Sequence, residues 1–388
     1  MDQIATLDGK RLWTRDFVVI TLISLFTFLG FQMLLPTLPI YARHLGGSDT
    51  AAGLVVGIFT ISAVIIRPFT GHYLDLYGRK GILLLGLLIF TASVLAYAWA
   101  PSLLILLAFR FLHGFGWGLS STASSTAATD IIPRSRLGEG MGYFGLAGTL
   151  SMALAPALGL YIINNFNFNA LFLLSAGMVV IAIMLALTIN YHKPARSSAG
   201  FSLVEKAALR PTIVVFFITM TYGAIVAFIA LYAAQQGISN IGSFFTIYAL
   251  TLALARPVCG RLADKIGFDF IIVPGIILVS SAMFLLYFAS SIQWFWLAAI
   301  FYGAGFGAAQ PVLQAQAVIS VPLQRRGLAN GTFFTGFDLG IGLSSIMWGA
   351  VAEVTGYSVM YLLATIPAIA GLACYLLLGR HTKEETTV

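Results

Sequence analysis

Two stretches of this chain are nearly alike: RPFTGHYLDLYG at residues 67–78 and RPVCGRLADKIG at residues 256–267. Both begin with Arg-Pro and keep glycine and aspartate at matching positions. The matching pairs are Gly71 and Gly260, Asp75 and Asp264, and Gly78 and Gly267. We call the shift in numbering that carries Arg67 to Arg256 the repeat offset. In both stretches a long apolar run breaks into charge, and the repetition predicts that one structural unit occurs twice in the chain.

The composition predicts a membrane protein. Of 388 residues, 59% are hydrophobic and only 9% are charged, which is more apolar surface than a water-soluble core can hide. We find twelve apolar runs of about 20 residues, the length of a helix that crosses a bilayer. The runs lie at residues 17–42, 51–73, 81–99, 103–126, 140–163, 168–190, 212–234, 241–262, 270–289, 294–318, 328–354 and 357–378. We therefore expect an all-α fold of twelve transmembrane helices in two six-helix bundles.

The basic residues predict the orientation. Among the 21 Lys and Arg, only Arg43 and Arg110 lie outside the termini, the loops after even-numbered spans and the adjoining helix ends. Both termini and these loops should be cytoplasmic, with the protein in the inner (plasma) membrane. The net charge of +7 comes from this bias, and the basic loops are attracted to anionic lipid. We therefore do not expect nucleic-acid binding. Cys259 and Cys374 fall in predicted spans, so we expect no disulfide framework and no metal site.

The repeat offset extends beyond the first motif. It maps Gly53 to Gly242, Gly114, Gly116 and Gly118 to Gly303, Gly305 and Gly307, and Pro133, Arg136 and Gly138 to Pro322, Arg325 and Gly327. Copies of six spans each are parallel repeats, an arrangement that places a substrate site at their interface near the midplane of the membrane. We expect an N-terminal bundle at residues 1–190, a cytoplasmic linker at 191–210 and a C-terminal bundle at 211–388.

The motifs make the chain resemble the major facilitator superfamily over essentially its whole length, and in particular its drug:proton antiporters and sugar-efflux exporters. The family signature G-x-x-x-D-x-x-G-R-K stands here as Gly71, Asp75, Gly78, Arg79 and Lys80. The second copy keeps Gly260, Asp264 and Gly267 but has Phe268 and Asp269 in place of the basic pair. The resemblance implies that this loop braces the second span against the eleventh, and that the brace breaks as the bundles rock.

The residue types in the motif suit such a latch. Gly71 permits a close approach of a neighbouring helix, and Gly78 permits a turn that other residues would strain. Asp75 can meet the positive N-terminal end of a helix. The alternative is that these charges only set the topology and cap helix ends.

Arg110 and His113 lie inside the fourth predicted span, where an arginine is costly unless it faces a partner or water. With Gly114, Arg110 matches the R-x-x-x-G motif that the resembled antiporters associate with proton transfer. His113 could carry a proton near neutral pH. The alternatives are an arginine that reaches the outer membrane surface and a neutral, packed histidine.

Asp338 is the one acid deep inside a predicted span, about 15 Å from its cytoplasmic start. A carboxylate at that depth could take up and release a proton as its exposure changes, which predicts a role in coupling or substrate binding. The alternative is a structural salt bridge, for example with Arg110.

The fifth span contains Pro156 and Gly159, placed like the Gly-Pro signature of family exporters, although Ser151 and Ala155 replace the usual glycines. Pro156 could also be a simple helix kink. Polar side chains predicted to line a substrate pocket are Gln32, Tyr143, Tyr222, Gln310 and Gln314.

The sequence has no phosphate-binding loop, zinc motif or nucleophile elbow, so we expect a non-enzyme without a cofactor. The residues together predict a monomeric, proton-coupled exporter of small amphipathic molecules such as drugs, sugars or metabolites, in contact with membrane lipid. The alternatives are an uptake symporter, a lipid or glycolipid flippase, and a receptor or scaffold that transports nothing.

Overall fold

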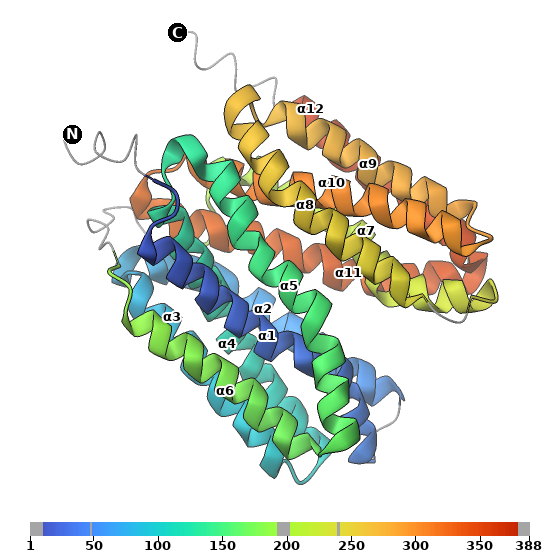
Figure 1. Cartoon of the computed structure of the whole chain (residues 1–388), viewed down its shortest axis with the longest axis horizontal. Helices are drawn as coiled ribbons and strands as arrows, with labels where there is room; N and C mark the ends of the chain where they lie inside the picture. The colour runs from blue at the N-terminus through green and yellow to red at the C-terminus, as the bar shows by residue number, and fades with distance from the viewer. Residues whose placement is uncertain (1–10, 47–48, 192–201, 239–240, 379–388) are drawn as a thin grey trace. The chain divides into compact units, whose positions relative to one another are not determined.

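The computed structural model describes residues 11–46, 49–191, 202–238 and 241–378, and in these residues every regular element is a helix. Half of the expected linker, residues 192–201, therefore lies outside the described residues, while the part near its end forms the short helix η3 (Lys206–Ala208). Figure 1 labels the long helices. They are α1 (Arg15–His44), α2 (Asp49–Tyr77), α3 (Arg79–Ala96), α4 (Leu103–Ile131), α5 (Leu137–Asn165), α6 (Phe168–Leu187), α7 (Leu209–Gln235), α8 (Gly242–Ile266), α9 (Asp269–Tyr287), α10 (Ile292–Ile319), α11 (Arg326–Leu363) and α12 (Thr365–Leu378).

Eleven stretches of the described chain are long and apolar enough to cross a membrane. The last of them, Leu323–Leu378, has 56 residues, whereas a helix of about 20 residues suffices for one crossing. Inside it, Gly356 has φ 80° and ψ 163°, a non-helical conformation in the region that favours glycine. The break falls between the two spans expected at 328–354 and 357–378, and the all-α membrane fold is confirmed.

The described chain forms two compact units. Unit 1 contains the described residues within Met1–Arg134, Phe144–Glu205 and Val321–Thr332. Unit 2 contains those within Ser135–Tyr143, Lys206–Ser320 and Phe333–Val388. Each unit thus includes a short segment from the opposite half of the sequence. One segment holds the start of α11 and the other holds the start of α5.

The repeat predicted from the sequence is visible in how each unit packs. A Cβ on Gly116 of α4 would lie 2.6 Å from the backbone nitrogen of Phe90 on α3. A Cβ on Gly305 of α10 would lie 2.5 Å from the carbonyl oxygen of Gly275 on α9. These distances are too short for real Cβ atoms, so glycine is required for the helices to touch. Gly116 and Gly305 are related by the repeat offset.

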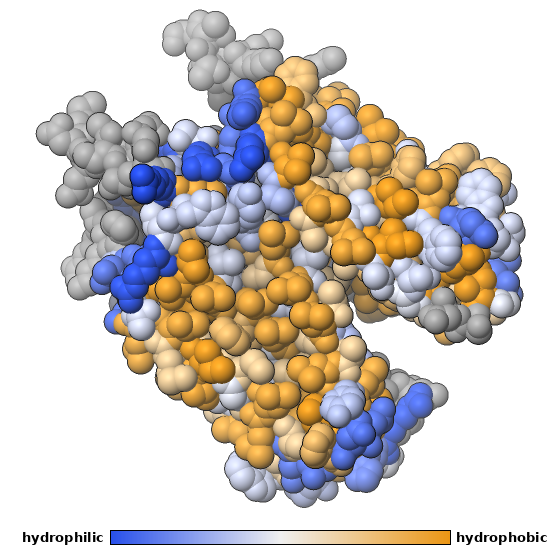
Figure 2. All heavy atoms as spheres, viewed as in Figure 1, coloured by the Kyte–Doolittle hydropathy of each residue, from blue (hydrophilic) through white to orange (hydrophobic). Residues whose placement is uncertain are grey.

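The outer surfaces of the helices are apolar. Leu104 is 75% exposed, Leu254 71% and Ile346 78%. On the face shown in Figure 2, hydrophobic side chains cover the lengths of the helices, whereas hydrophilic side chains gather toward their ends. Exposed apolar surface of this extent needs a hydrocarbon solvent. The chain is a multi-pass membrane protein.

Candidate functional site

Asp75, near the end of α2, accepts hydrogen bonds from two successive backbone amides at the start of α11. Its Oδ1 lies 2.9 Å from the amide nitrogen of Gly327, and its Oδ2 lies 2.8 Å from that of Leu328. First-turn amides have no acceptor within their own helix, and the helix dipole favours a negative charge beside them. We call this arrangement, which lies within unit 1, the α2 contact.

The second copy of the motif makes the same arrangement within unit 2. The two carboxylate oxygens of Asp264 on α8 each lie 2.8 Å from a backbone amide nitrogen, one of Gly138 and one of Glu139. Both amides belong to the first turn of α5. We call this arrangement the α8 contact. The repeat offset relates Asp75 to its aspartate and relates its first donor, Gly138, to Gly327.

The glycines of the motif make these contacts possible. A Cβ on Gly71 would lie 2.8 Å from the carbonyl oxygen of Gly327, and one on Gly260 would lie 2.2 Å from that of Gly138. No side chain fits in that space. Gly78 and Gly267, which follow α2 and α8, have φ of 89° and 104°, a backbone conformation that side-chain-bearing residues rarely adopt.

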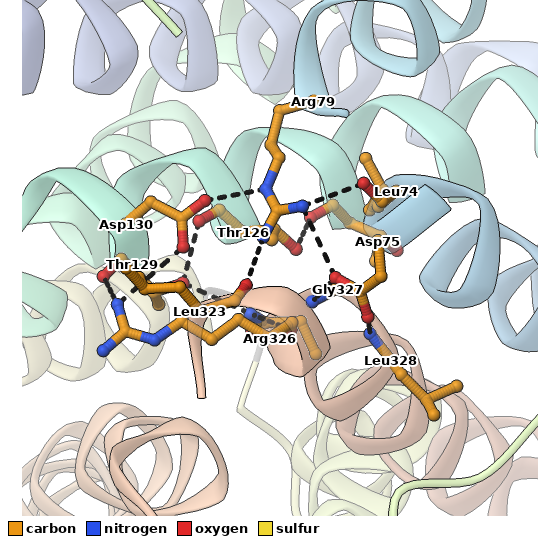
Figure 3. Close-up of polar contacts among 12 residues, drawn as sticks. Leu74, Asp75, Arg79, Thr126, Thr129, Asp130, Leu323, Arg326, Gly327 and Leu328 are labelled. Carbon is orange, nitrogen blue, oxygen red and sulfur yellow. Dashed lines mark hydrogen bonds and ion pairs between the residues drawn. The ribbon is translucent and has the colours of Figure 1, made fainter. Parts of the chain in front are cut away.

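Arg79 connects the α2 contact to α4 (Figure 3). Its Nε donates to Asp130 Oδ2 at 2.7 Å, while Nη1 donates to the carbonyl oxygen of Leu74 and lies 3.4 Å from Asp75 Oδ1. Its Nη2 donates to the carbonyl oxygen of Leu323 at 2.7 Å. Arg79 is 2% exposed, and such buried charges need several partners. Lys80, by contrast, is exposed.

Arg326 and Asp130 were not singled out from the sequence. Arg326, the first residue of α11, is 1% exposed and donates to the carbonyl oxygen of Thr129; its Nη1 lies 3.8 Å from Asp130 Oδ1. Asp130 thus stands between two buried arginines. The sequence signal for it is an acid four residues after the fourth predicted span, shortly before the basic loop at residues 134–136.

The described residues of unit 2 contain no counterpart of Arg79, because the second motif has Phe268 at that position. A different set of charges surrounds the α8 contact. Glu139, 3% exposed, is bound by Arg136 Nε at 2.7 Å and by Arg261 Nη2 at 2.8 Å. The two contacts therefore share their carboxylate geometry but differ in the ion pairs around them.

Arg110 and His113 form a buried cluster in unit 1. Arg110, 1% exposed, donates from Nε to the carbonyl oxygen of Val55 at 3.0 Å, and its guanidinium carbon lies 4.2 Å from the ring centroid of Phe59. Its Nη1 lies 3.1 Å from His113 Nδ1, to which the hydroxyl of Tyr97 is also bound at 2.8 Å. Arginine can only donate, so Nδ1 accepts and the His113 proton sits on Nε2. In this arrangement, His113 can gain a proton at Nδ1 only if Arg110 moves.

Asp338 is part-buried on the portion of α11 that belongs to unit 2. It lies twelve positions after Arg326, about 18 Å along the helix. The glycines on either side pack on α7. A Cβ on Gly336 would lie 2.9 Å from the carbonyl oxygen of Thr212, and one on Gly340 would lie 2.4 Å from that of Phe216. Asp338 is thus held on a stretch of helix that is fixed closely to its neighbour.

The small residues of α5 pack on α1 within unit 1. A Cβ on Gly159 would lie 2.6 Å from the carbonyl oxygen of Met33, and the hydroxyl of Ser151 donates to the carbonyl oxygen of Leu25 at 3.3 Å. Pro156 stands inside the helix between them. Residues 151–159 of α5 therefore pack tightly against α1.

Two arginines that the sequence analysis counted among helix ends lie deep in their helices. Arg67 and Arg256 are each ten residues before the last residue of α2 and α8, about 15 Å along the axis. Arg67 Nη1 donates to the hydroxyls of Ser121 at 3.1 Å and Thr122 at 2.9 Å. Arg256 Nη2 donates to Gln310 Oε1 at 3.1 Å. Counting residues back from the glycine of each motif would have found both.

Of the polar side chains predicted to line a pocket, four belong to unit 2. Tyr222 and Gln310 lie in one cluster with Arg256, and Gln314 is one turn further along α10. Tyr143 follows Gly142, whose Cβ would lie 2.4 Å from the carbonyl oxygen of Arg256. Gln32, 8% exposed, belongs to unit 1.

Comparisons with known proteins cover the whole set of helices. A family model described as Major Facilitator Superfamily matches residues 20–243 and 212–388. The staphylopine export protein of Staphylococcus aureus is 24% identical over 377 residues, which cover 92% of this chain and 93% of that protein. The multidrug resistance protein MdtG of Citrobacter koseri is 25% identical over 373 residues, with coverage of 90% and 91%. The human organic anion transporter MFSD10 has a similar fold, with a TM-score of 0.82 at 18% identity and coverage of 93% and 99%.

Proposed function

Because the chain belongs to the Major Facilitator Superfamily of membrane transporters, we propose that it exports small amphipathic molecules in exchange for protons by alternating access. The export direction is supported by two relatives, one named a staphylopine export protein and the other a multidrug resistance protein. The amphipathic cargo is supported by the mixture of aromatic and amide side chains around Tyr222 and Gln310.

The observation that carries the proposal is the pair of α2 and α8 contacts. In each contact a carboxylate accepts hydrogen bonds from two backbone amides. The carboxylate belongs to a helix from one half of the sequence, and the amides belong to the first turn of a helix from the other half. A state in which these helices separate from their partners has to break these bonds. The contacts therefore act as a latch that favours one state. We assign the latch to the cytoplasmic side because the basic residues of the chain gather around it.

We assign proton coupling to Asp338, with Arg110 and His113 as the groups that respond to it. Asp338 is a part-buried acid well inside α11, where a change in exposure would change its preference for a proton. His113 is bound by Arg110, so its protonation would require the α4 cluster to rearrange. Gln32, Tyr143, Tyr222, Gln310 and Gln314 are proposed to contact the cargo as access alternates.

Transport in proteoliposomes tests the exchange. We would reconstitute the purified protein into vesicles with an acidic interior that contain the pH dye pyranine, and add ethidium or naphthoate as cationic and anionic amphipathic probes. Antiport predicts that a probe accumulates inside while the interior becomes more alkaline faster than in protein-free liposomes. In a second set of vesicles that are preloaded with the probe, release of the probe together with protons would identify a symporter and overturn the export proposal.

A further inference from the structure

Arg256 lies in the middle of α8 beside groups that can recognise a negative charge. Its Nη2 donates to Gln310 Oε1 on α10 at 3.1 Å, and Tyr222 on α7 and Tyr248 on α8 lie near its guanidinium. The side chain is part-buried. An arginine at such a depth is costly in hydrocarbon and marks a functional position.

An aromatic stack stands next to this arginine. Tyr222 is stacked on Phe306 with ring centroids 5.3 Å apart and an interplanar angle of 24°, and Phe306 is stacked on Tyr302 at 5.7 Å and 17°. The hydroxyl of Tyr302 is fixed 3.0 Å from that of Thr221. Tyr302 is fully buried and Phe306 is 4% exposed, whereas Tyr222 is part-buried. The stack therefore offers the ring of Tyr222 as a flat, supported surface beside the guanidinium.

The equivalent positions of unit 1 hold an arginine and an aromatic ring as well, but that arginine is fully buried. The repeat offset maps Arg67 to Arg256, Ser121 to Gln310 and Trp117 to Phe306. Trp117 is stacked on Phe31 with centroids 4.3 Å apart, and Arg67 is 2% exposed and bound to two hydroxyls. The duplicated scaffold thus holds a fully buried arginine in unit 1 and a part-buried one in unit 2.

We propose that Arg256, Gln310 and Tyr222 bind the carboxylate of an amphipathic cargo molecule whose ring or apolar body lies against Tyr222. The inference rests on the proposed function and assigns a chemical class to the cargo. The guanidinium is a planar fork of donors that matches the two oxygens of a carboxylate, and charge-assisted bonds of this type are strong. The amide of Gln310 and the phenol of Tyr222 supply further N–H and O–H donors.

Equilibrium binding of radiolabelled naphthoate to the purified protein in phosphatidylcholine nanodiscs tests this site, with naphthamide as the neutral probe of the same shape. The parent should bind naphthoate more tightly than naphthamide. Arg256→Gln should weaken naphthoate binding at least about tenfold and leave naphthamide binding unchanged. Gln310→Glu provides a second variant of nearly unchanged shape. The carboxylate of this glutamate would form an ion pair with the Arg256 guanidinium, so naphthoate affinity should fall by a similar factor.

Lys265→Gln is the matched control, because it removes the same charge from an exposed position at the end of the same helix. It should bind naphthoate like the parent. Equal affinity of the parent for both probes, or parent-like naphthoate binding by Gln310→Glu, would overturn the assignment. Displacement of naphthoate by phosphatidylglycerol in the nanodisc would also overturn it, because the site would then hold a lipid phosphate.

The binding assay uses no pH gradient, so it separates this inference from the proposed function. If naphthoate binds as described but protons and probes do not exchange, the export proposal fails and the anion site stands. If ethidium exchanges for protons but Arg256→Gln binds naphthoate like the parent, the anion site alone is rejected.

Discussion

At Asp75, one carboxylate oxygen accepts from Gly327 and the other from Leu328. Asn at this position keeps one acceptor oxygen, turns an NH₂ group toward an amide donor and loses the negative charge. We expect Asp75→Asn to weaken the α2 contact by about 2 kcal/mol and to shift the population toward the cytoplasm-open state by roughly 30-fold. Spin-label distances between Tyr77→Cys and Phe270→Cys, two exposed positions, would report the shift.

Glu353→Gln is the control for this prediction, because it removes an acid from an exposed position of α11. Membrane insertion and yield should be the same for both variants. Identical distance distributions in Asp75→Asn and the parent would show that the α2 contact does not act as a latch.

Asp338→Asn keeps nearly the same volume but cannot take up a proton. We expect this variant to lose pH-driven accumulation of substrate while retaining substrate binding and counterflow exchange, since exchange without net proton movement needs no titrating group. Accumulation and counterflow measured on the same vesicle preparation would separate the two. Accumulation at the parent rate with undiminished proton flux would make Asp338 structural, and His113 would be the next residue to test.

Residues with a motif around them were predictable, whereas residues defined by distant partners were not. The glycines and aspartates of the two motifs could be given a helix-end contact from their types and spacing alone. Asp130 could not, because its partner Arg79 is 51 positions away and only the packing of α4 brings them within 2.7 Å. Arg67 and Arg256 were overlooked because their distance from the helix end was not counted.

Among the helices, α2 and α11 approach closely because Gly71 lacks a side chain. A methyl group there would lie 2.8 Å from the carbonyl oxygen of Gly327. We therefore expect Gly71→Ala to separate the two helix ends and lengthen the bonds of Asp75, lowering the thermal midpoint by several degrees. Thermal unfolding of the purified variant by a thiol-free fluorescence assay would measure this.

Gly57→Ala is the matched control on the same helix. No other atom lies within 4 Å of a Cβ at Gly57, and alanine is the better helix former by about 1 kcal/mol. This variant should be as stable as the parent or more so. Equal loss of stability in both variants would point to a general intolerance of α2 rather than to the contact at Gly71.

The boundaries of the helices were predictable where a polar turn separates two apolar runs. The break between the last two spans, for example, was expected within residues 355–356, and the structure has its non-helical residue at Gly356. Helix starts that are defined by tertiary contacts were less predictable from the sequence. The fifth and eleventh spans were predicted to start at residues 140 and 328, whereas α5 and α11 begin at Leu137 and Arg326. These two helix starts lie within the segments Ser135–Tyr143 and Val321–Thr332.

For the whole molecule, duplication explains both what could be predicted and what could not. The constant repeat offset is visible in the sequence and predicts two similar units. The differences between the copies decide function, and they depend on side-chain environments. Arg67 and Arg256 are equivalent in sequence, but only the structure shows that one is enclosed by hydroxyls and the other is part-buried beside Gln310.

Because unit 1 includes Val321–Thr332, the two halves of the chain should stabilise each other when they are made separately. We expect a fragment of residues 1–190 to be more stable when co-expressed with residues 191–388 than alone. Asp75→Asn should lower the thermal midpoint of the pair and leave that of the lone fragment unchanged, because the fragment has no α11 to bind. Equal effects of the substitution in both samples would contradict the assignment of Asp75 to that contact.

The late position of Val321–Thr332 in the sequence determines when the α2 contact can form during biosynthesis. Asp75 leaves the ribosome long before Gly327 and Leu328 exist, so about 250 residues must be translated before its carboxylate oxygens meet their donors, which takes roughly 12–50 s at typical rates. During that interval the insertion machinery has to shelter a buried aspartate and Arg79 with their surroundings incomplete. Asp264 needs no such delay, since Gly138 and Glu139 are already in place when it is made. The α8 contact can thus form as soon as Asp264 is made, whereas the α2 contact has to wait until residues 327 and 328 have been made.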